Sequence, residues 1–430
     1  MRVQVIAIVA AAVLAAVEPP ARPVTWADLP STVQSRLEQN GITASSFTGK
    51  LAGIDREARR RVHEGDLDHL VFYILQSTHF TKLPPIEPAL SAKAFASDAG
   101  VPSAAAGRIT AFLRAIASTD ADPRVSYFRA LIGGVPPGER RQLIEREYAR
   151  AMKFLYDQEF VHRPKVVALY PARGLSTDTA VEAGYAVHAG LGVLKGLDPS
   201  RRIHRVLIVG PGIDLAPRTG LLEVGAPESY QPWAVIDALV SLELSRLDDL
   251  DVVAGDINPR VVDHLRASGK RAPVLRFVSG IGETSSVALV PGYREYFAAL
   301  GSAVGSVGGG SRAPSGHLSK TVVVSARAAA RLRAEALNIV TERLTGAPFD
   351  LVIATNILPY FEKAELLLAV SNIAGLLAPG GVFLHNDTRP EVQEVAATAG
   401  LLPEQLRQVI IANVRGASPL ADTVVLHSKR

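Results

Sequence analysis

The stretch RVLIVGPGIDLAPRTG, residues 205–220, decides the fold prediction. Its first residues form a short apolar run without helical spacing, which predicts a buried strand ending at Gly210. From here to the end of the chain, short apolar runs alternate with amphipathic stretches. Alternation of strands with helices predicts an α/β fold with a parallel, doubly wound sheet. Further apolar runs span 251–255, 349–354 and 381–386, and the amphipathic stretches span 232–247, 258–268 and 362–377.

The end of the chain has a different pattern. The apolar runs 408–414 and 421–428 are separated only by RGASPL, which is too short for a crossover helix. They therefore predict an antiparallel strand at the end of the sheet. Upstream, residues 301–316 contain six Gly and four Ser, and this composition predicts a mobile surface loop without strand or helix.

Residues 25–200 have mainly helical spacing, which predicts an all-helical domain before the sheet. Its last helix is expected to be capped by Ser176 or Thr177 and to end near Asp198. The predicted organisation is a signal-peptide-like segment over 1–22, a helical domain over 23–200 and the sheet domain over 201–430.

The N-terminus carries an uncharged apolar run, VQVIAIVAAAVLAAV, over residues 3–17. Small residues followed by Glu18-Pro19-Pro20 are typical of a secretory signal peptide. Fifteen residues are few for a membrane span of ~20, so an anchor is the second interpretation and a buried helix the third. We expect export to the periplasm or the cell exterior, or a cytoplasmic protein if the segment is not functional. No later segment is long and apolar enough to span a membrane.

The composition narrows the chemistry. With 430 residues, 48% of them hydrophobic and 20% charged, the chain is expected to form globular domains. A net charge of +4 without a basic block does not indicate a dedicated nucleic-acid surface. The absence of cysteine excludes disulfides, thiolate nucleophiles and Cys-based metal sites. His162 has no neighbouring histidine to complete a metal site, so no metal is predicted.

Gly210 and Gly212 follow the first strand, where an open α/β sheet binds nucleotide-like ligands. A plain turn is the alternative interpretation. Leu215 stands where a dinucleotide fingerprint needs glycine, and the next helix begins only near Pro232, so a nicotinamide-dependent oxidoreductase ranks last. Asp256 ends the second strand, where its carboxylate could accept hydrogen bonds from both ribose hydroxyls. A helix N-cap is the alternative role for Asp256.

These segments together resemble the class I S-adenosylmethionine-dependent methyltransferases. VLIVGPG is similar to their first motif, GDIN to the acidic motif after it, FDLVIATNIL to the fourth-strand motif and LLAPGGVFLHND to the turn before the fifth strand. The resemblance covers residues 200–430. The stretches DIN, YREYF, ALNIV and FDLVIATNILPYF are further similar to the receptor-glutamate methyltransferases of bacterial chemotaxis.

The resemblance implies a Rossmann-like methyltransferase sheet and S-adenosylmethionine as the small-molecule cofactor. It implies that Gly210 and Gly212 approach the cofactor, that Asp256 holds the ribose, that Asn338 and Ile339 flank the adenosine, and that Asn356 lies beneath the methionine part. Two features depart from the pattern. Residues 213–231 separate the first loop from its helix, and Thr355 replaces the arginine of the chemotaxis enzymes.

Methyl transfer needs few catalytic side chains, because the sulfonium methyl is already activated. The protein has only to align the acceptor and to exclude water from the site. An amine or phenol acceptor also needs a proton acceptor, and Tyr360, His385 and Asp387 are the polar residues nearest the predicted strand ends. The alternative for Tyr360 is packing in the core, that for His385 is hydrogen bonding to the backbone, and that for Asp387 is capping of a helix. Arg218 could pair with the cofactor carboxylate or remain solvated.

The sequence thus supports a methyltransferase in which the helical domain forms one wall of the acceptor pocket. The alternative is a non-catalytic exported protein with a methyltransferase-like binding domain. No sequence motif indicates which compound accepts the methyl group.

Overall fold

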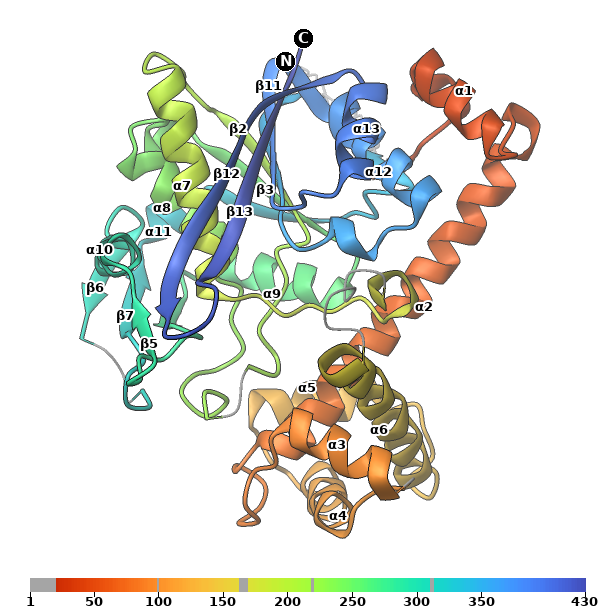
Figure 1. Cartoon of the computed structure of the whole chain (residues 1–430), viewed down its shortest axis with the longest axis vertical. Coiled ribbons are helices and arrows are strands. Elements are labelled where there is room, and N and C mark those ends of the chain that lie inside the picture. The colour runs from red at the N-terminus through yellow and green to blue at the C-terminus, as the bar shows by residue number, and fades with distance from the viewer. Residues whose placement is uncertain (1–20, 99, 162–168, 218–219, 310–312) are drawn as a thin grey trace, which may run out of the picture.

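A computed structural model describes residues 21–98, 100–161, 169–217, 220–309 and 313–430. Figure 1 shows a sheet flanked by helices, a bundle of helices beside it, and one long helix that runs between them. The expected signal segment, apart from its last two residues, lies outside the described residues, as do His162 and Arg218. Within the described residues, no helix is long and apolar enough to cross a membrane.

The regular elements of the described chain up to residue 200 are helices and one short strand, so the helical spacing predicts this region well. The elements are β1 (Ala21–Pro23), the 3-10 turn η1 (Trp26–Asp28), α1 (Ser31–Gln39), α2 (Ala44–Gln76), α3 (Pro88–Asp98), α4 (Ser103–Ala117), α5 (Pro123–Leu131), α6 (Arg140–Tyr156), the π-helical turn η2 (Asp157–Val161) and α7 (Val181–Leu197). The expected cap of α7 at Ser176 or Thr177 is wrong, because Ala180 is the N-cap. Its expected end is confirmed at Asp198.

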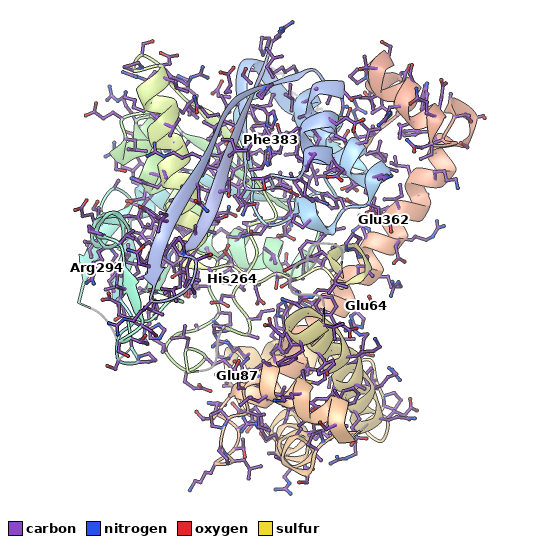
Figure 2. The ribbon with its side chains drawn as sticks, in the orientation of Figure 1. Glu64, Glu87, His264, Arg294, Glu362 and Phe383 are labelled. Atoms are coloured by element: carbon purple, nitrogen blue, oxygen red, sulfur yellow. The ribbon has the colours of Figure 1, made fainter. Side chains whose placement is uncertain are left out.

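Helix α2 has 33 residues and is therefore about 50 Å long, at 1.5 Å per residue. Its first turns bury Phe47 and Leu51 with residues of the sheet part, whereas Val71 and Leu75 are buried among the bundle helices. Figure 2 shows Glu64 at the level where α2 passes from the sheet part into the bundle. One helix thus contacts both parts.

The predicted boundary between residues 200 and 201 does not divide the chain into two independently packed parts. β1 pairs antiparallel with β9 (Glu342–Leu344), with Ala21 opposite Leu344. α7 packs on the sheet so closely that a Cβ on Gly190 would lie 2.6 Å from Val424 Cγ1. Both ends of the helical region therefore pack with residues of the predicted sheet domain, β1 in a separate two-stranded sheet with β9 and α7 on the eight-stranded sheet.

The sheet has eight strands in the order β5-β12-β13-β11-β10-β2-β3-β8. β11, β10, β2, β3 and β8 are mutually parallel, whereas β13, β12 and β5 join through antiparallel pairs. This confirms the predicted doubly wound sheet with an antiparallel strand near its end. The strands are β2 (Arg205–Val209), β3 (Asp251–Asp256), β5 (Val287–Leu289), β8 (Leu332–Ala336), β10 (Phe349–Ala354), β11 (Leu377–His385), β12 (Leu401–Val414) and β13 (Leu420–Lys429).

Both faces of the sheet are buried, which explains the apolar strands. In β2, Val206 and Ile208 pack with α7, α8 (Gln231–Ser241) and α9 (Pro259–Lys270). Leu207 and Val209 pack on the opposite face with α1, α12 (Lys363–Leu376) and α13 (Pro390–Thr398). The remaining short elements are η4 (Leu247–Asp249), α10 (Pro291–Ala299), α11 (Ala326–Ala329) and η5 (Leu358–Tyr360).

A second, three-stranded antiparallel sheet is inserted between α9 and β8, in the order β4-β7-β6. Its strands are β4 (Val274–Val278), β6 (Gly305–Gly308) and β7 (Ser319–Val324). The prediction that 301–316 holds no strand is therefore wrong for β6. A Cβ on Gly305 would lie 2.0 Å from Val323 O, so the close approach of β7 requires glycine there. Residues 310–312 lie outside the described residues.

Candidate functional site

A cavity lies at the carboxyl ends of β2, β3, β8 and β10. The chain passes from β2 to β3 and β8 on one side and later to β10 on the other, so the cavity sits at the topological switch point. All six residues that the sequence nominated line it, namely Gly210, Gly212, Asp256, Asn338, Ile339 and Asn356. Other lining residues include Ala58, Val62, Leu175, Ser176, Thr177, Asp178, Thr179, Gln231, Thr355, Ile357 and Tyr360.

The first loop requires its two glycines. Gly210 and Gly212 have φ of +65° and +68°, a conformation that costs other residues energy. A Cβ on Gly212 would lie 2.3 Å from Thr177 O, and one on Gly210 would lie 2.7 Å from Ile357 Cγ2. The alternative of a plain turn does not account for these contacts, because both glycines let the backbone form part of the cavity wall.

The third glycine of a dinucleotide fingerprint is replaced by Leu215, which is fully buried. Beyond Leu215, the chain runs toward the helical bundle before α8 begins at Gln231 (Figure 1). The Arg124 guanidinium of α5 donates to Leu215 O at 2.9 Å and to Gly225 O at 2.7 Å. The long first loop is thus fastened to the bundle.

Asp256 ends β3 and is 6% exposed. Its carboxylate accepts hydrogen bonds from Asn258 N at 2.8 Å and Gly212 N at 3.4 Å. Burial raises the pKa of Asp256 to about 6, and these N–H groups act in the opposite direction. The alternative role as N-cap is wrong, because Asn258 caps α9 by accepting from Arg260 N at 3.0 Å. A carboxylate has about four acceptor positions, so Asp256 keeps acceptor capacity beyond these backbone N–H groups.

The helical bundle fixes the chain beside Asp256. Asp66 of α2 is fully buried and accepts from Asn258 Nδ2 at 3.0 Å, Arg260 Nη1 at 2.8 Å and Tyr127 Oη at 2.8 Å. One carboxylate therefore joins α2 and α5 to the start of α9. Nothing in the sequence pattern pointed to Asp66.

Asn338 and Ile339 line the cavity but have their polar groups engaged elsewhere. The Asn338 amide donates to Asp55 Oδ1 of α2 at 2.8 Å, and Ile339 O accepts from Asn372 Nδ2 at 2.8 Å. Asn338 therefore holds the loop after β8 against α2. Asn338 and Ile339 therefore form part of the cavity wall but offer few free hydrogen-bonding groups to a ligand.

Asn356 follows β10 with a φ of +61°, a left-handed conformation that asparagine tolerates better than most residues. Its backbone N donates to Asn386 Oδ1 at 2.9 Å, and Asn386 Nδ2 donates back to Asn356 Oδ1 at 2.7 Å. Next to it, Thr355 Oγ1 accepts from Gln231 Nε2 at 2.8 Å. The ends of β10 and β11 and the start of α8 are therefore locked together.

Of the three predicted proton acceptors, only Tyr360 lines the cavity. Asp387 forms a bidentate pair with Arg389. His385 is fully buried, stacks on His427 at a centroid distance of 5.1 Å, and has a pKa lowered by burial to about 3. His385 and Asp387 therefore lie outside the cavity lining, with their polar groups engaged by other residues.

The helical region supplies one wall of the cavity, as expected. Ala58 and Val62 belong to α2, and the extended segment Leu175–Thr179 lies just before α7. The sequence GLSTDTA has the polar composition of a helix start, and this pattern gives no sign that the segment lines the cavity. Among the described residues, no group of three or more His, Asp or Glu could hold a metal ion.

The sequence matches no protein-family model and no curated protein. Among solved structures, a TehB-like SAM-dependent methyltransferase from Corynebacterium glutamicum is similar, with 13% identity over 57% of this chain and 87% of that chain, at a TM-score of 0.27. The N-methyltransferase NodS from Bradyrhizobium japonicum in complex with S-adenosyl-l-homocysteine has 12% identity over 62% and 98%, at a TM-score of 0.30. Magnesium protoporphyrin IX methyltransferase from Synechocystis has 7% identity over 58% and 85%, at a TM-score of 0.29.

The fold assignment rests on the chain's own topology. Five parallel strands with the switch point at β2, followed by the antiparallel strand β13 beside β11, form the sheet that the motifs implied. The chain therefore has the fold of the class I S-adenosylmethionine-dependent methyltransferases.

Proposed function

We propose that this protein is an S-adenosylmethionine-dependent methyltransferase. The observation that carries the proposal is Asp256, an almost buried carboxylate at the tip of β3 that keeps acceptor capacity beside the glycine loop. Ribose hydroxyls are donors that match this capacity. A buried carboxylate without such partners would be costly, and its raised pKa shows that burial is incompletely offset.

The residues of the cavity fit this cofactor. Asp256 would hold the ribose, Ile339 and Leu337 would flank the adenine, and Gly210 and Gly212 would let the backbone approach the methionine part. When bound, the cofactor supplies a sulfonium methyl that is already activated. The chain's own task is to align an acceptor with that methyl and to exclude water. Ala58 and Val62 of α2 contribute an apolar wall suited to exclusion of water.

The test is isothermal titration of the full chain with S-adenosylmethionine and with its demethylated product, S-adenosylhomocysteine. Asp256→Ala is expected to weaken binding by about 10- to 100-fold, because hydrogen bonds to a charged acceptor contribute ~1.5–3 kcal/mol and each ~1.4 kcal/mol is tenfold. Asp263→Asn on α9 is the matched control, since Asp263 is exposed and Asp256 is not.

Two results would contradict the proposal or its details. If the wild-type chain binds neither compound at millimolar concentration, the chain is a non-catalytic protein with a methyltransferase fold. If Asp256→Ala binds as tightly as wild type, Asp256 does not hold the ribose. A melting curve for each variant separates lost binding from lost folding.

A further inference from the structure

The extended segment Leu175–Thr179 is held against the first loop. Ile213 N donates to Thr177 O at 2.8 Å, and Thr177 Oγ1 donates to Ile213 O at 3.3 Å. At its start, Leu175 N donates to Arg61 O of α2 at 2.8 Å. The segment is therefore a fixed part of the cavity wall, and its side chains have defined positions.

Asp178 is the acidic residue of this segment, and a buried imidazole stands behind it. His69 of α2 is fully buried, and its Nε2 accepts from Thr177 N at 3.1 Å. In a neutral imidazole the proton must then be on Nδ1, which lies 3.2 Å from Asp178 Oδ1. The Asp178 side chain itself is 42% exposed and lines the cavity. One oxygen of an accessible carboxylate is thus in close contact with a buried imidazole nitrogen, and this contact is not aligned as a hydrogen bond.

The position of Asp178 is at the reactive end of the cavity. Asp256 and Asn338 lie at the tips of β3 and β8, whereas Thr177 crosses over Gly212 beyond β2. If the ribose lies at Asp256, the sulfur and methyl lie toward β2 and β10. Tyr360, after β10, also lines the cavity, and burial raises the pKa of its phenol while the charge of Arg173 lowers it.

Charges of both signs surround Asp178, namely the Asp214 carboxylate and the Arg173 guanidinium. Asp214, beside the segment, has a pKa raised well above its usual range, first by burial and then by the charge of Asp178.

We propose that Asp178 is the acceptor-side base, that His69 positions it, and that the methyl acceptor is an amine or a hydroxyl whose nucleophilic atom carries a proton. This inference rests on the proposed function. The acceptor's lone pair forms the new bond to the methyl carbon, the electrons of the carbon–sulfur bond stay on sulfur, and the acceptor's proton passes to Asp178. An Asp178 carboxylate that hydrogen-bonds the N–H or O–H group also orients its lone pair.

Sinefungin tests this without knowledge of the acceptor. In this analogue of S-adenosylmethionine, a carbon that bears a primary amine replaces the sulfonium and its methyl, so the amine occupies the reactive position. S-adenosylhomocysteine lacks that group. We expect Asp178→Asn to raise the Kd of sinefungin about 10- to 100-fold in isothermal titration and to leave the Kd of S-adenosylhomocysteine within about threefold. Asp263→Asn should change neither.

The outcomes separate the two proposals. If wild type does not bind S-adenosylhomocysteine, the proposed function fails and this inference fails with it. If wild type binds both compounds and Asp178→Asn keeps the wild-type ratio of the two Kd values, the function stands and the role of Asp178 is wrong.

His69 needs its own readout, because a positioning residue acts only through Asp178. His69→Gln can still accept from Thr177 N and donate to Asp178, so it should keep the preference for sinefungin. His69→Leu should lose it while binding S-adenosylhomocysteine. If His69→Leu and wild type prefer sinefungin over S-adenosylhomocysteine equally, His69 has only a packing role and does not position Asp178.

Discussion

At the scale of single residues, Gly212 sets how closely the two walls of the cavity approach. Gly212→Ala meets two obstacles, a φ of +68° and an overlap with Thr177 O at 2.3 Å. Gly416, in the hairpin between β12 and β13, has a φ of +74° with nothing within 4 Å. Gly416→Ala should therefore cost about 1–2 kcal/mol of unfolding free energy, the cost of the left-handed backbone alone.

Gly212→Ala should cost more than Gly416→Ala and should also abolish binding of S-adenosylhomocysteine. Relief of the overlap displaces Thr177 and with it the segment that carries Asp178. Urea denaturation and isothermal titration of both variants provide the measurements. Equal destabilisation by the two substitutions would show that the segment before α7 moves freely.

His385 and His427 form a directed chain of hydrogen bonds in the sheet. Asp387 N donates to His385 Nδ1 at 3.2 Å, so Nε2 of neutral His385 carries the proton and donates to His427 Nδ1 at 3.2 Å. His427 Nε2 then donates to Gln393 Oε1 at 3.0 Å. Both rings are satisfied only when neutral. Burial lowers the pKa of His385 to about 3 and that of His427 to about 4.

This pair makes folding sensitive to acid. Below the ordinary histidine pKa of ~6.5, the two histidines bind protons in the unfolded chain but stay neutral in the folded chain. The free energy of unfolding therefore decreases as the pH falls from about 6.5 toward 4. Each histidine contributes up to ~1.4 kcal/mol per pH unit. His427→Gln should flatten this dependence in urea denaturation at several pH values. The same flattening in His63→Gln, where the side chain is exposed, would contradict the assignment.

At the scale of elements, α2 is the connection between the bundle and the site. Its Asp66 is buried with three hydrogen-bond donors from α5 and α9. Asp66→Asn removes the charge that pairs with Arg260 and leaves fewer acceptor positions, so we expect a loss of about 2–4 kcal/mol in unfolding free energy. Glu57→Gln on the same helix breaks an exposed pair with Arg60 and should cost at most ~0.5 kcal/mol. Similar urea midpoints for the two variants would show that Asp66 does not stabilise the fold in this way.

Elements were predictable from the sequence where a local pattern determines them. β2, β3 and β10 are buried on both faces and are apolar throughout, and α12 is a long apolar helix with a capping box. β8, with the sequence LRAEA, and β6, with GSVG, have no such pattern. They form because β3 and β7 offer edges for pairing. Such strands depend on tertiary contacts that local periodicity does not carry.

The same reasoning applies to the site. Gly210, Gly212, Asp256 and Asn356 follow strands, and parallel strands bring their carboxyl ends to one edge, so their meeting was predictable. His69 and Asp178 are 109 positions apart on a helix and on an irregular segment. Their contact depends on how the helical region folds over the sheet. Fold rules for open sheets do not describe that, so the sequence pattern does not point to this contact.

At the scale of the whole molecule, the packing predicts that residues 201–430 do not fold alone. The helical region contributes Val33, Leu37, Phe47 and Leu51 to the core over α12, and α7 covers the other face of the sheet. Burial of four such side chains contributes about 6–12 kcal/mol, as much as the whole stability of a typical domain, about 5–15 kcal/mol. A fragment of 201–430 would expose both surfaces.

We therefore expect the isolated fragment 201–430 to show strand and helix signals in far-UV circular dichroism without a cooperative melting transition, and to bind a hydrophobic dye. The full chain should melt cooperatively, and S-adenosylhomocysteine at 100 times its Kd should raise its unfolding free energy by about 2.7 kcal/mol. The fragment should gain nothing from the ligand, because the α2 wall of the cavity and the segment that holds the first loop through Thr177 are missing. A sharp, ligand-dependent transition of the fragment would show instead that the sheet with its glycine loop and Asp256 is sufficient for folding and for binding, and that the helical region serves the methyl acceptor alone.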